Sequence, residues 1–207
     1  MKIQFRTAKE NDSELLAWAM LKSSRSGKKM GLFDLIFETS DEKELLTKLG
    51  KLSSSKAKSS AHFSNFLIAT VDGKNAALLC GYEPRIATQD KFTEALAEQG
   101  VDETYLDRIE AYSKCETDLD RRTWMLDYME ELEGFDQLEI LKELVQKSLL
   151  TARLKGYRNT QTFVEVDCAE AEIVYEKLGF TIKSEHRCEN YSEIFGRAGI
   201  KRLEMHL

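Results

Sequence analysis

The chain has 207 residues, of which 42% are hydrophobic and 32% are charged, and its formal net charge is -6. This length and apolar content suffice for a buried core, so we expect a single domain over residues 1–207. One proline and an acidic balance argue against a disordered chain and against a nucleic-acid partner, because phosphate backbones attract Lys and Arg. No apolar run reaches the roughly 18 residues of a membrane helix, so no membrane partner is expected.

Two helices are expected in the first quarter of the chain. Asn11 or Asp12 can cap a helix that runs to Lys22, with its apolar side chains on one side. Residues 41–52 carry leucines at steps of three and four, which is typical of a second helix. The serine- and lysine-rich residues 53–60 cannot bury apolar area, so we expect a flexible loop or a frayed helix end there, and we treat the segment as a loop.

A hairpin and a polar helical segment are expected next. The apolar residues 66–71 and 76–82 are joined by Asp72-Gly73-Lys74-Asn75, which is a strong turn signal. Residues 89–114 are helical in pattern and very polar, with a thin apolar stripe. We interpret 89–114 as a helical insertion that covers one face. It is either a pair of solvated helices or part of a substrate pocket or dimer contact.

The most informative stretch lies near the C-terminus. Residues 163–167 alternate as a strand does, and a short helix that carries Ala171 and Tyr175 follows. Gly179 can take the left-handed conformation that ends a helix, and Phe180 opens a new extended run. The predicted order is therefore strand, short helix, glycine stop and strand.

This order resembles the acyl-CoA half of the GNAT superfamily of N-acetyltransferases, whose members carry "Ala, three residues, Tyr-Glu-Lys-x-Gly-Phe" on the helix between their last strands. Here the pattern runs from Ala171 to Phe180. The resemblance covers residues 120–207 well, and the N-terminal half less, through an opening strand at residues 5–8 and the hairpin. It implies a GNAT-like α/β (α+β) fold with a mixed, mostly antiparallel sheet flanked by helices. Its register places a central strand at residues 124–129 and the main helix at residues 137–156.

The resemblance also implies an activity, which is transfer of an acetyl or related acyl group from acetyl-CoA to an amine by direct attack. Family members bind the CoA pyrophosphate with an Arg- and Gly-rich loop at the N-terminus of the main helix, where the helix dipole favours anions. That signature is absent here, because the aligned loop is acidic. The positions that the register assigns to cofactor binding are Met129, Phe135, Asp136, Gln137, Leu138, Glu139, Cys168 and Ala171.

The acidic loop opposes pyrophosphate binding in two ways. Asp136, followed three residues later by Glu139, is close to a capping box, so the helix can satisfy its free N–H groups with its own side chains. A carboxylate about 4 Å from a phosphate also costs roughly 1 kcal/mol in water. A second hypothesis is therefore a catalytically inactive GNAT-fold binding or regulatory protein that has lost CoA. A third is an acyltransferase with an altered donor, in which basic residues from elsewhere, such as Arg121, Arg122 or Lys142, replace the missing loop.

Tyr175 is the candidate general acid. The resemblance implies that its phenol protonates the CoA thiolate as it leaves, and a phenol with a pKa near 10 is protonated at neutral pH. The alternative is a helix tyrosine that packs against Phe180. Cys168 occupies the position where many family members have an Asn, which weakens positioning of the acyl group.

Asp127 is the candidate general base, with Glu130 and Glu131 as further acidic residues nearby. Strand alternation places Asp127 on the face of Met125 and Met129, opposite Trp124, Leu126 and Tyr128. A carboxylate among apolar groups has a raised pKa, which suits a base. The alternative is a strand-edge aspartate that caps a neighbour or faces solvent.

The remaining polar side chains suggest no further chemistry. The chain begins without the apolar core of a signal peptide, which predicts a cytoplasmic protein. Its four cysteines lack C-x-x-C spacing, so we expect free thiols, among them surface thiols at Cys115 and Cys188. The three histidines stand at no ligand spacing, and no metal is expected. The resemblance implies a small-molecule or peptide amine as the acceptor. It leaves undecided which amine this is and whether the chain forms a homodimer.

Overall fold

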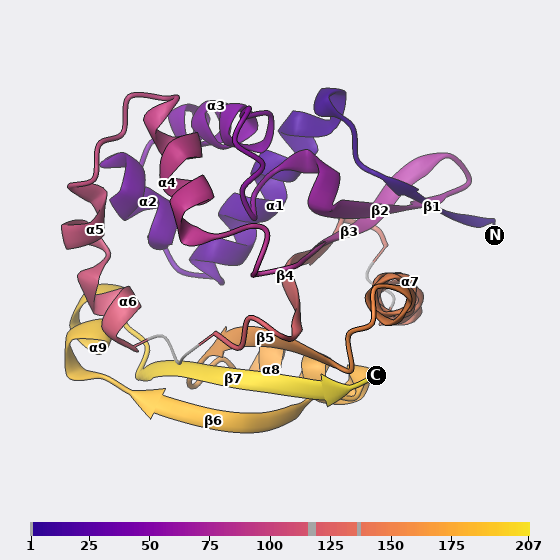
Figure 1. Cartoon of the computed structure of the whole chain (residues 1–207). Helices are drawn as coiled ribbons and strands as arrows, with labels where there is room; N and C mark the ends of the chain where they lie inside the picture. The colour runs from indigo at the N-terminus through magenta and orange to yellow at the C-terminus, as the bar shows by residue number, and fades with distance from the viewer. Residues whose placement is uncertain (1, 116–118, 136–137) are drawn as a thin grey trace.

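The computed structural model describes residues 2–115, 119–135 and 138–207, which form a sheet with helices on both faces (Figure 1). The strands are β1 (Ile3–Thr7), β2 (Phe66–Val71), β3 (Lys74–Tyr82), β4 (Trp124–Glu131), β5 (Asn159–Glu165), β6 (Thr181–Arg187) and β7 (Gly199–His206). The helices are α1 (Ser13–Arg25), α2 (Leu32–Phe37), α3 (Glu42–Ser53), α4 (Gln89–Ala97), α5 (Tyr105–Arg108), α6 (Glu110–Cys115), α7 (Leu138–Leu154), α8 (Ala169–Leu178) and α9 (Glu189–Phe195), with 3-10 turns η1 (Glu10–Asp12) and η2 (Phe63–Asn65).

The sheet has the order β1-β2-β3-β4-β5-β7-β6. Its neighbouring strands are antiparallel except for the parallel pair β4 and β5. This confirms the predicted α/β fold with a mixed, mostly antiparallel sheet flanked by helices. Within the described residues, β4 and β5 pair only at Trp124↔Thr160 and Met125↔Gln161. The two strands therefore separate beyond Met125.

Local sequence signals account for the boundaries of several elements. Asp72 and Gly73 have φ values of 48° and 83°, which suit the two-residue turn that joins β2 to β3. Gly179 takes the predicted left-handed conformation at φ 101° and ends α8. Asp41 caps α3 by accepting a 2.7 Å hydrogen bond from the N–H of Glu44. β5 covers Asn159–Glu165, so the strand predicted at residues 163–167 begins and ends earlier than expected.

Helices α1, α2 and α3 cover one face of the sheet, and α7 and α8 cover the other (Figure 1). On the first face, Leu16 and Leu45 pack with Ile68 from the sheet. On the second face, α7 lies so close to β3 that a Cβ at Gly81 would stand 2.5 Å from Ser148 Oγ. Glycine is needed there because no side chain fits between strand and helix.

The predicted flexible loop at residues 53–60 is wrong in part, because Ser53, Ser55 and Ser59 are buried. Two backbone N–H groups of this segment donate to the carboxylate of Glu98, at 3.0 Å from Lys56 and 2.9 Å from residue 57. Glu98 directly follows α4 and lies 42 and 41 residues further along the chain than these two N–H groups, which would otherwise need other partners. These hydrogen bonds to Glu98 hold the segment in place, and the pattern of apolar residues in the sequence could not predict them.

Helices α4, α5 and α6, which span the segment predicted as a polar insertion, cover part of the first face. Leu96 and Tyr105 are fully buried and Ile109 nearly so, while Leu106 stays exposed. The interpretation as a pair of solvated helices is therefore wrong. The apolar stripe is part of the core because α5 packs against α2 and α6 packs against α9.

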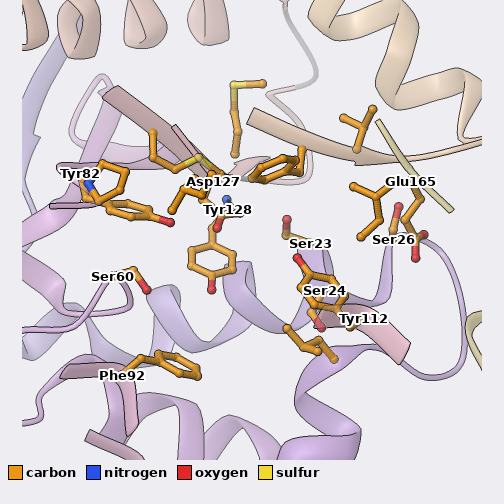
Figure 2. Close-up of a pocket in the computed structure, with 18 of the residues that line it drawn as sticks. Ser23, Ser24, Ser26, Ser60, Tyr82, Phe92, Tyr112, Asp127, Tyr128 and Glu165 are labelled. Atoms are coloured by element: carbon orange, nitrogen blue, oxygen red, sulfur yellow. Dashed lines mark hydrogen bonds between the residues drawn. The ribbon is translucent and has the colours of Figure 1, made fainter. Parts of the chain in front are cut away.

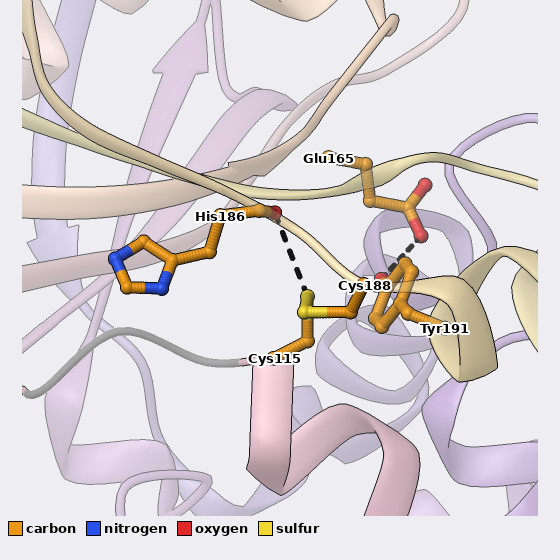
Figure 3. Close-up of a disulfide and its surroundings, with 5 residues drawn as sticks. All are labelled: Cys115, Glu165, His186, Cys188 and Tyr191. Atoms are coloured by element: carbon orange, nitrogen blue, oxygen red, sulfur yellow. Dashed lines mark hydrogen bonds between the residues drawn. A yellow bond between two sulfur atoms is a disulfide. The ribbon is translucent and has the colours of Figure 1, made fainter.

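Cys115 at the end of α6 and Cys188 before α9 form a disulfide with a Cα–Cα distance of 5.8 Å (Figure 3). The prediction of free surface thiols at these two positions is therefore wrong. The two cysteines are 73 residues apart in sequence, so only the packing of α6 against α9 brings them together. Cys80 and Cys168 are free thiols, as expected, and both are buried.

Candidate functional site

A cavity of about 610 Å³ lies on the first face of the sheet, where β4 and β5 separate (Figure 2). This volume lies within the range of ordinary small-molecule sites. Side chains that line it come from α1 and the loop after it, from β4 and β5, and from α4, α6, α8 and α9. The polar and aromatic members most relevant to function are Ser23, Ser26, Phe33, Tyr82, Phe92, Tyr112, Asp127, Tyr128, Glu130, Glu165 and Tyr175.

A bulge in β4 shapes this cavity. Cys80 of β3 pairs with Asp127, but Leu78 pairs with Glu130, so two residues of β4 lie opposite one residue of β3. Tyr128 takes up the irregularity with φ 47°, in the left-handed region that a bulky side chain rarely adopts. The bulge bends β4 at the point where it has left β5.

The bulge also reverses the alternation of side chains along β4. Tyr128 packs on the first face, where its ring lies 6.0 Å from Phe66 and 6.2 Å from Phe33. Met129 packs on the face of α7 instead. The predicted alternation is therefore correct up to Asp127 and wrong for the next two residues, because one extra residue shifts the period of two.

Asp127 faces the cavity from the residue before the bulge. Burial raises the pKa of its carboxyl group to about 6. Its Oδ1 accepts a 2.9 Å hydrogen bond from the N–H of Tyr128, which opposes that rise. Among the described residues it has no ion-pair partner. Asp127 thus caps a neighbouring N–H, as one prediction had it, and is also a half-buried carboxylate on the wall of the cavity.

Tyr175 of α8 reaches the same cavity from the other side of the gap between β4 and β5. Its hydroxyl oxygen accepts a 3.4 Å hydrogen bond from Thr162 Oγ1. Burial, with a smaller contribution from the charges of Asp127 and Glu130, raises the pKa of the phenol above its usual value. The ring packs edge-on against Phe180 at 5.4 Å. The two predictions for Tyr175 are therefore compatible, because the ring packs in the core and the protonated hydroxyl faces the cavity.

The predicted cofactor-binding positions do not all lie together in the structure. Met129 and Ala171 line the cavity. Phe135 packs against the core under α7, and its N–H donates to the carbonyl of Leu132 at 3.1 Å. The other positions of the acidic loop show no contact with the cavity among the residues that the structure describes. Asp136, Gln137 and the side chain of Leu138 lie outside the described residues, and Glu139 is exposed in the first turn of α7.

Cys168 stands at the N-terminus of α8, where it provides no side-chain cap. Its buried sulfur lies 3.5 Å from the hydroxyl of Ser26 in the loop after α1. An amide side chain at this position would have offered both a donor and an acceptor, whereas a thiol is a weak partner for either. Cys168 does not line the cavity itself, and it contributes only this weak contact to Ser26, which does.

The structure does not bring Arg121 and Arg122 to the beginning of α7. Trp124 Nε1 donates to Ser148 Oγ at 3.1 Å, so the start of β4 faces the second half of that helix. The eight residues of β4 span roughly 25 Å, which places both arginines at the far end. Lys142, one turn into α7, is the only member of the predicted trio near the helix start.

An ion-pair cluster around Glu165 was not predicted. The carboxylate of Glu165 is bound by Lys28, accepts a 2.7 Å hydrogen bond from Tyr191 (Figure 3), and lies 3.8 Å from Arg197. Lys28 lies in the loop after α1, among Gly27, Lys29 and Gly31. No sequence signal linked that loop to a strand end 137 residues away.

Comparisons with known proteins identify the fold. Neither a protein-family model nor a curated protein matches the sequence. Solved structures do match. An N-acetyltransferase from Staphylococcus aureus Mu50 aligns with a TM-score of 0.70 over 98% of this chain and 100% of its own, at 12% identity. An acetyltransferase of the GNAT family from Streptococcus pneumoniae aligns with a TM-score of 0.52 over 100% and 99% of the two chains, at 17% identity.

The PaiA N-acetyltransferase from Thermoplasma acidophilum, solved in complex with coenzyme A, aligns over 100% of both chains with a TM-score of 0.55 and 14% identity. The chain therefore has the GNAT acetyltransferase fold that its C-terminal motif predicts. None of the described helices has both the length and the apolar character of a membrane-crossing segment. Across the same residues, no three His, Cys, Asp or Glu side chains form a group that could hold a metal ion.

Proposed function

We propose that the protein is an N-acyltransferase that moves an acetyl or related acyl group from acetyl-CoA to an amine by direct attack. One observation carries the proposal: the cavity at the gap between β4 and β5 contains both Asp127 and Tyr175, a carboxylate with a pKa of about 6 and a protonated phenol. These are the base and the acid that acyl transfer from a thioester to an amine requires. The likeness in fold to solved acetyltransferases supports the same reading.

The proposed reaction uses each group once. The amine nitrogen attacks the thioester carbonyl carbon, the new C–N bond forms, and the C–S bond breaks. Asp127 takes the first proton that the bound amine loses, which leaves the nitrogen neutral and able to attack, and its pKa allows this because most of the carboxyl group is ionised at pH 7. The second proton, which the nitrogen loses after the C–N bond has formed, passes to solvent. Tyr175 gives its phenolic proton to the departing sulfur. Proton exchange with solvent then restores both side chains, and the products are an amide and CoA.

A second candidate function is a non-catalytic protein that keeps the fold and has lost CoA. The acidic approach to α7 favours it, because Glu133 before the helix and Glu139 in its first turn carry charges that would repel a pyrophosphate at the helix N-terminus. The two candidates differ in one measurable property, which is affinity for the acyl donor.

Thermal unfolding with and without millimolar acetyl-CoA, supported by calorimetric titration, separates these candidates. A ligand at about 100 times its Kd adds about 2.7 kcal/mol to the free energy of unfolding. For a chain of this size that raises Tm by roughly 5 to 10 °C. We expect such a shift. No shift and no heat of binding would refute the proposed function and leave the second candidate.

Tyr175→Phe tests the role of the phenol in turnover. The variant keeps the ring contact with Phe180 and loses the proton, so we expect a fall of roughly 10²- to 10⁴-fold in the single-turnover rate with unchanged donor affinity. Tyr157→Phe is the matched control, because that hydroxyl donates to Glu83 away from the cavity. A rate for Tyr175→Phe equal to that of the control would assign the tyrosine to packing alone.

We also propose a cytoplasmic location and a homodimer, and each has its own test. The Cys115–Cys188 disulfide is of a kind that reducing compartments rarely preserve, so the cytoplasmic location is best tested by alkylating free thiols in fresh cell extract. Alkylation of both cysteines would support a cytoplasmic protein. A homodimer is tested by sedimentation of the purified chain.

A further inference from the structure

We propose that the acceptor is a primary amine with a single positive charge and an aromatic or similarly sized apolar body, bound with its ammonium group beside Asp127. This inference rests on the proposed function, because it names the class of amine that the cavity selects. It goes beyond that function, since acyl transfer by itself requires only a nucleophilic nitrogen. The charges and the aromatic side chains of the cavity wall carry it.

Three carboxylates line the cavity, and two of them are already neutralised. Glu130 lies 3.0 Å from Lys22 Nζ. Glu165 is bound by Lys28 and stands 3.8 Å from Arg197. Asp127 alone has no cationic partner within the part of the chain that the structure describes. The interior therefore offers one uncompensated negative charge, which matches one ammonium group.

Several aromatic side chains line the same cavity as Asp127. In Figure 2, Tyr82, Tyr128 and Phe92 lie on the same side of the view as Asp127, and all line the cavity. Tyr128 is held nearly parallel to Phe66, with an angle of 9° between the ring planes. Rings held in this way contact a flat apolar body, and their faces also attract a cation.

The same arrangement disfavours the other acceptor classes. A polyamine brings further ammonium groups, which would meet carboxylates that Lys22 and Lys28 already occupy. An amino acid brings a carboxylate, and among the described lining residues the cationic side chain is Arg121, in the turn before β4. Because Arg121 is exposed, it offers that carboxylate a solvated partner of little net strength and not a buried one.

Calorimetric titration of the purified full chain tests the inference with four probes of related shape. 2-Phenylethylamine has the aromatic body and one charge, 2-phenylethanol lacks the charge, phenylalanine adds a carboxylate, and spermidine has several charges and no ring. Each is titrated with and without CoA, so that an obligatory order of binding does not hide the acceptor site. We expect 2-phenylethylamine to bind at least tenfold more tightly than each of the other three.

Asp127→Asn identifies the residue responsible. A hydrogen bond to a charged group contributes about 1.5 to 3 kcal/mol, so we expect affinity for 2-phenylethylamine to fall roughly 10- to 150-fold while affinity for 2-phenylethanol stays the same. Asp107→Asn is the matched control, because it removes the same charge from an exposed position away from the cavity. Urea unfolding of both variants establishes that they are folded.

The outcomes separate this inference from the proposed function. Equal or tighter binding of spermidine or phenylalanine would overturn the inference, and so would an Asp127→Asn variant that binds 2-phenylethylamine as the wild type does. No binding of any amine, with or without CoA, would overturn it as well. If 2-phenylethylamine binds through Asp127 but acetyl-CoA produces neither heat nor a shift in Tm, the proposed function fails and the amine site stands.

Discussion

Asp127→Asn should stabilise the folded chain at neutral pH. Burial raises the pKa of Asp127 from 3.8 to about 6. That difference of about 2.2 units, at about 1.36 kcal/mol for each unit, corresponds to about 3 kcal/mol. Since the folded state binds the proton more tightly than the unfolded state, the free energy of unfolding is highest below about pH 4 and falls as the pH rises to about 6. Asparagine removes the charge and retains an oxygen that can accept the N–H of Tyr128.

Urea unfolding at several pH values between 4 and 7 measures this effect. We expect the difference in free energy of unfolding between Asp127→Asn and wild type to grow from near zero at pH 4 to about 3 kcal/mol at pH 7, which is roughly 6 to 12 °C in Tm. The titratable groups around Asp127 are Cys80, Glu130 and Tyr175. The thiol and the phenol stay neutral in this range, and Glu130 titrates in both chains, so its contribution largely cancels.

The control for this experiment is Asp107→Asn, for which we expect no growing difference over the same pH range, because that carboxylate is exposed. A difference for Asp127→Asn that does not change with pH would refute the reasoning. So would an Asp127→Asn variant less stable than wild type at pH 7. Either result would mean that the ionised carboxylate of Asp127 is solvated or has a cationic partner.

Two further predictions concern stability. The double variant Cys115→Ser/Cys188→Ser should lose about 4 kcal/mol relative to the oxidised wild type, because the disulfide closes a long loop in the unfolded chain; in a dithiol reductant most of that difference should vanish, and persistence of the whole difference would contradict the loop-closure account. Gly81→Ala should cost roughly 1 to 3 kcal/mol, since its Cβ would stand 2.5 Å from Ser148 Oγ. Gly50→Ala, whose Cβ has no neighbour nearer than 3.8 Å, is the control, and equal urea midpoints for the two variants would show that the contact at Gly81 relaxes freely.

The sequence by itself determined the elements whose causes are local. Asp72 and Gly73 form a turn because both adopt positive φ values, and Gly179 ends α8 because glycine enters the left-handed region without a steric cost. The C-terminal order of strand, helix, glycine and strand predicted the fold. Strand alternation also placed Asp127 on the correct face. Each of these signals is carried by residues within a few positions of one another.

Only the tertiary structure decided the shape and charge of the cavity. The bulge at Tyr128 has no sequence signature, because a tyrosine at φ 47° is tolerated where packing between Phe33 and Phe66 supports it. Glu165 is neutralised by a lysine 137 residues away, whereas Asp127 has no such partner among the described residues. Whether a carboxylate is paired depends on which distant segments meet, and that is settled by the packing of the whole chain and not by its local sequence.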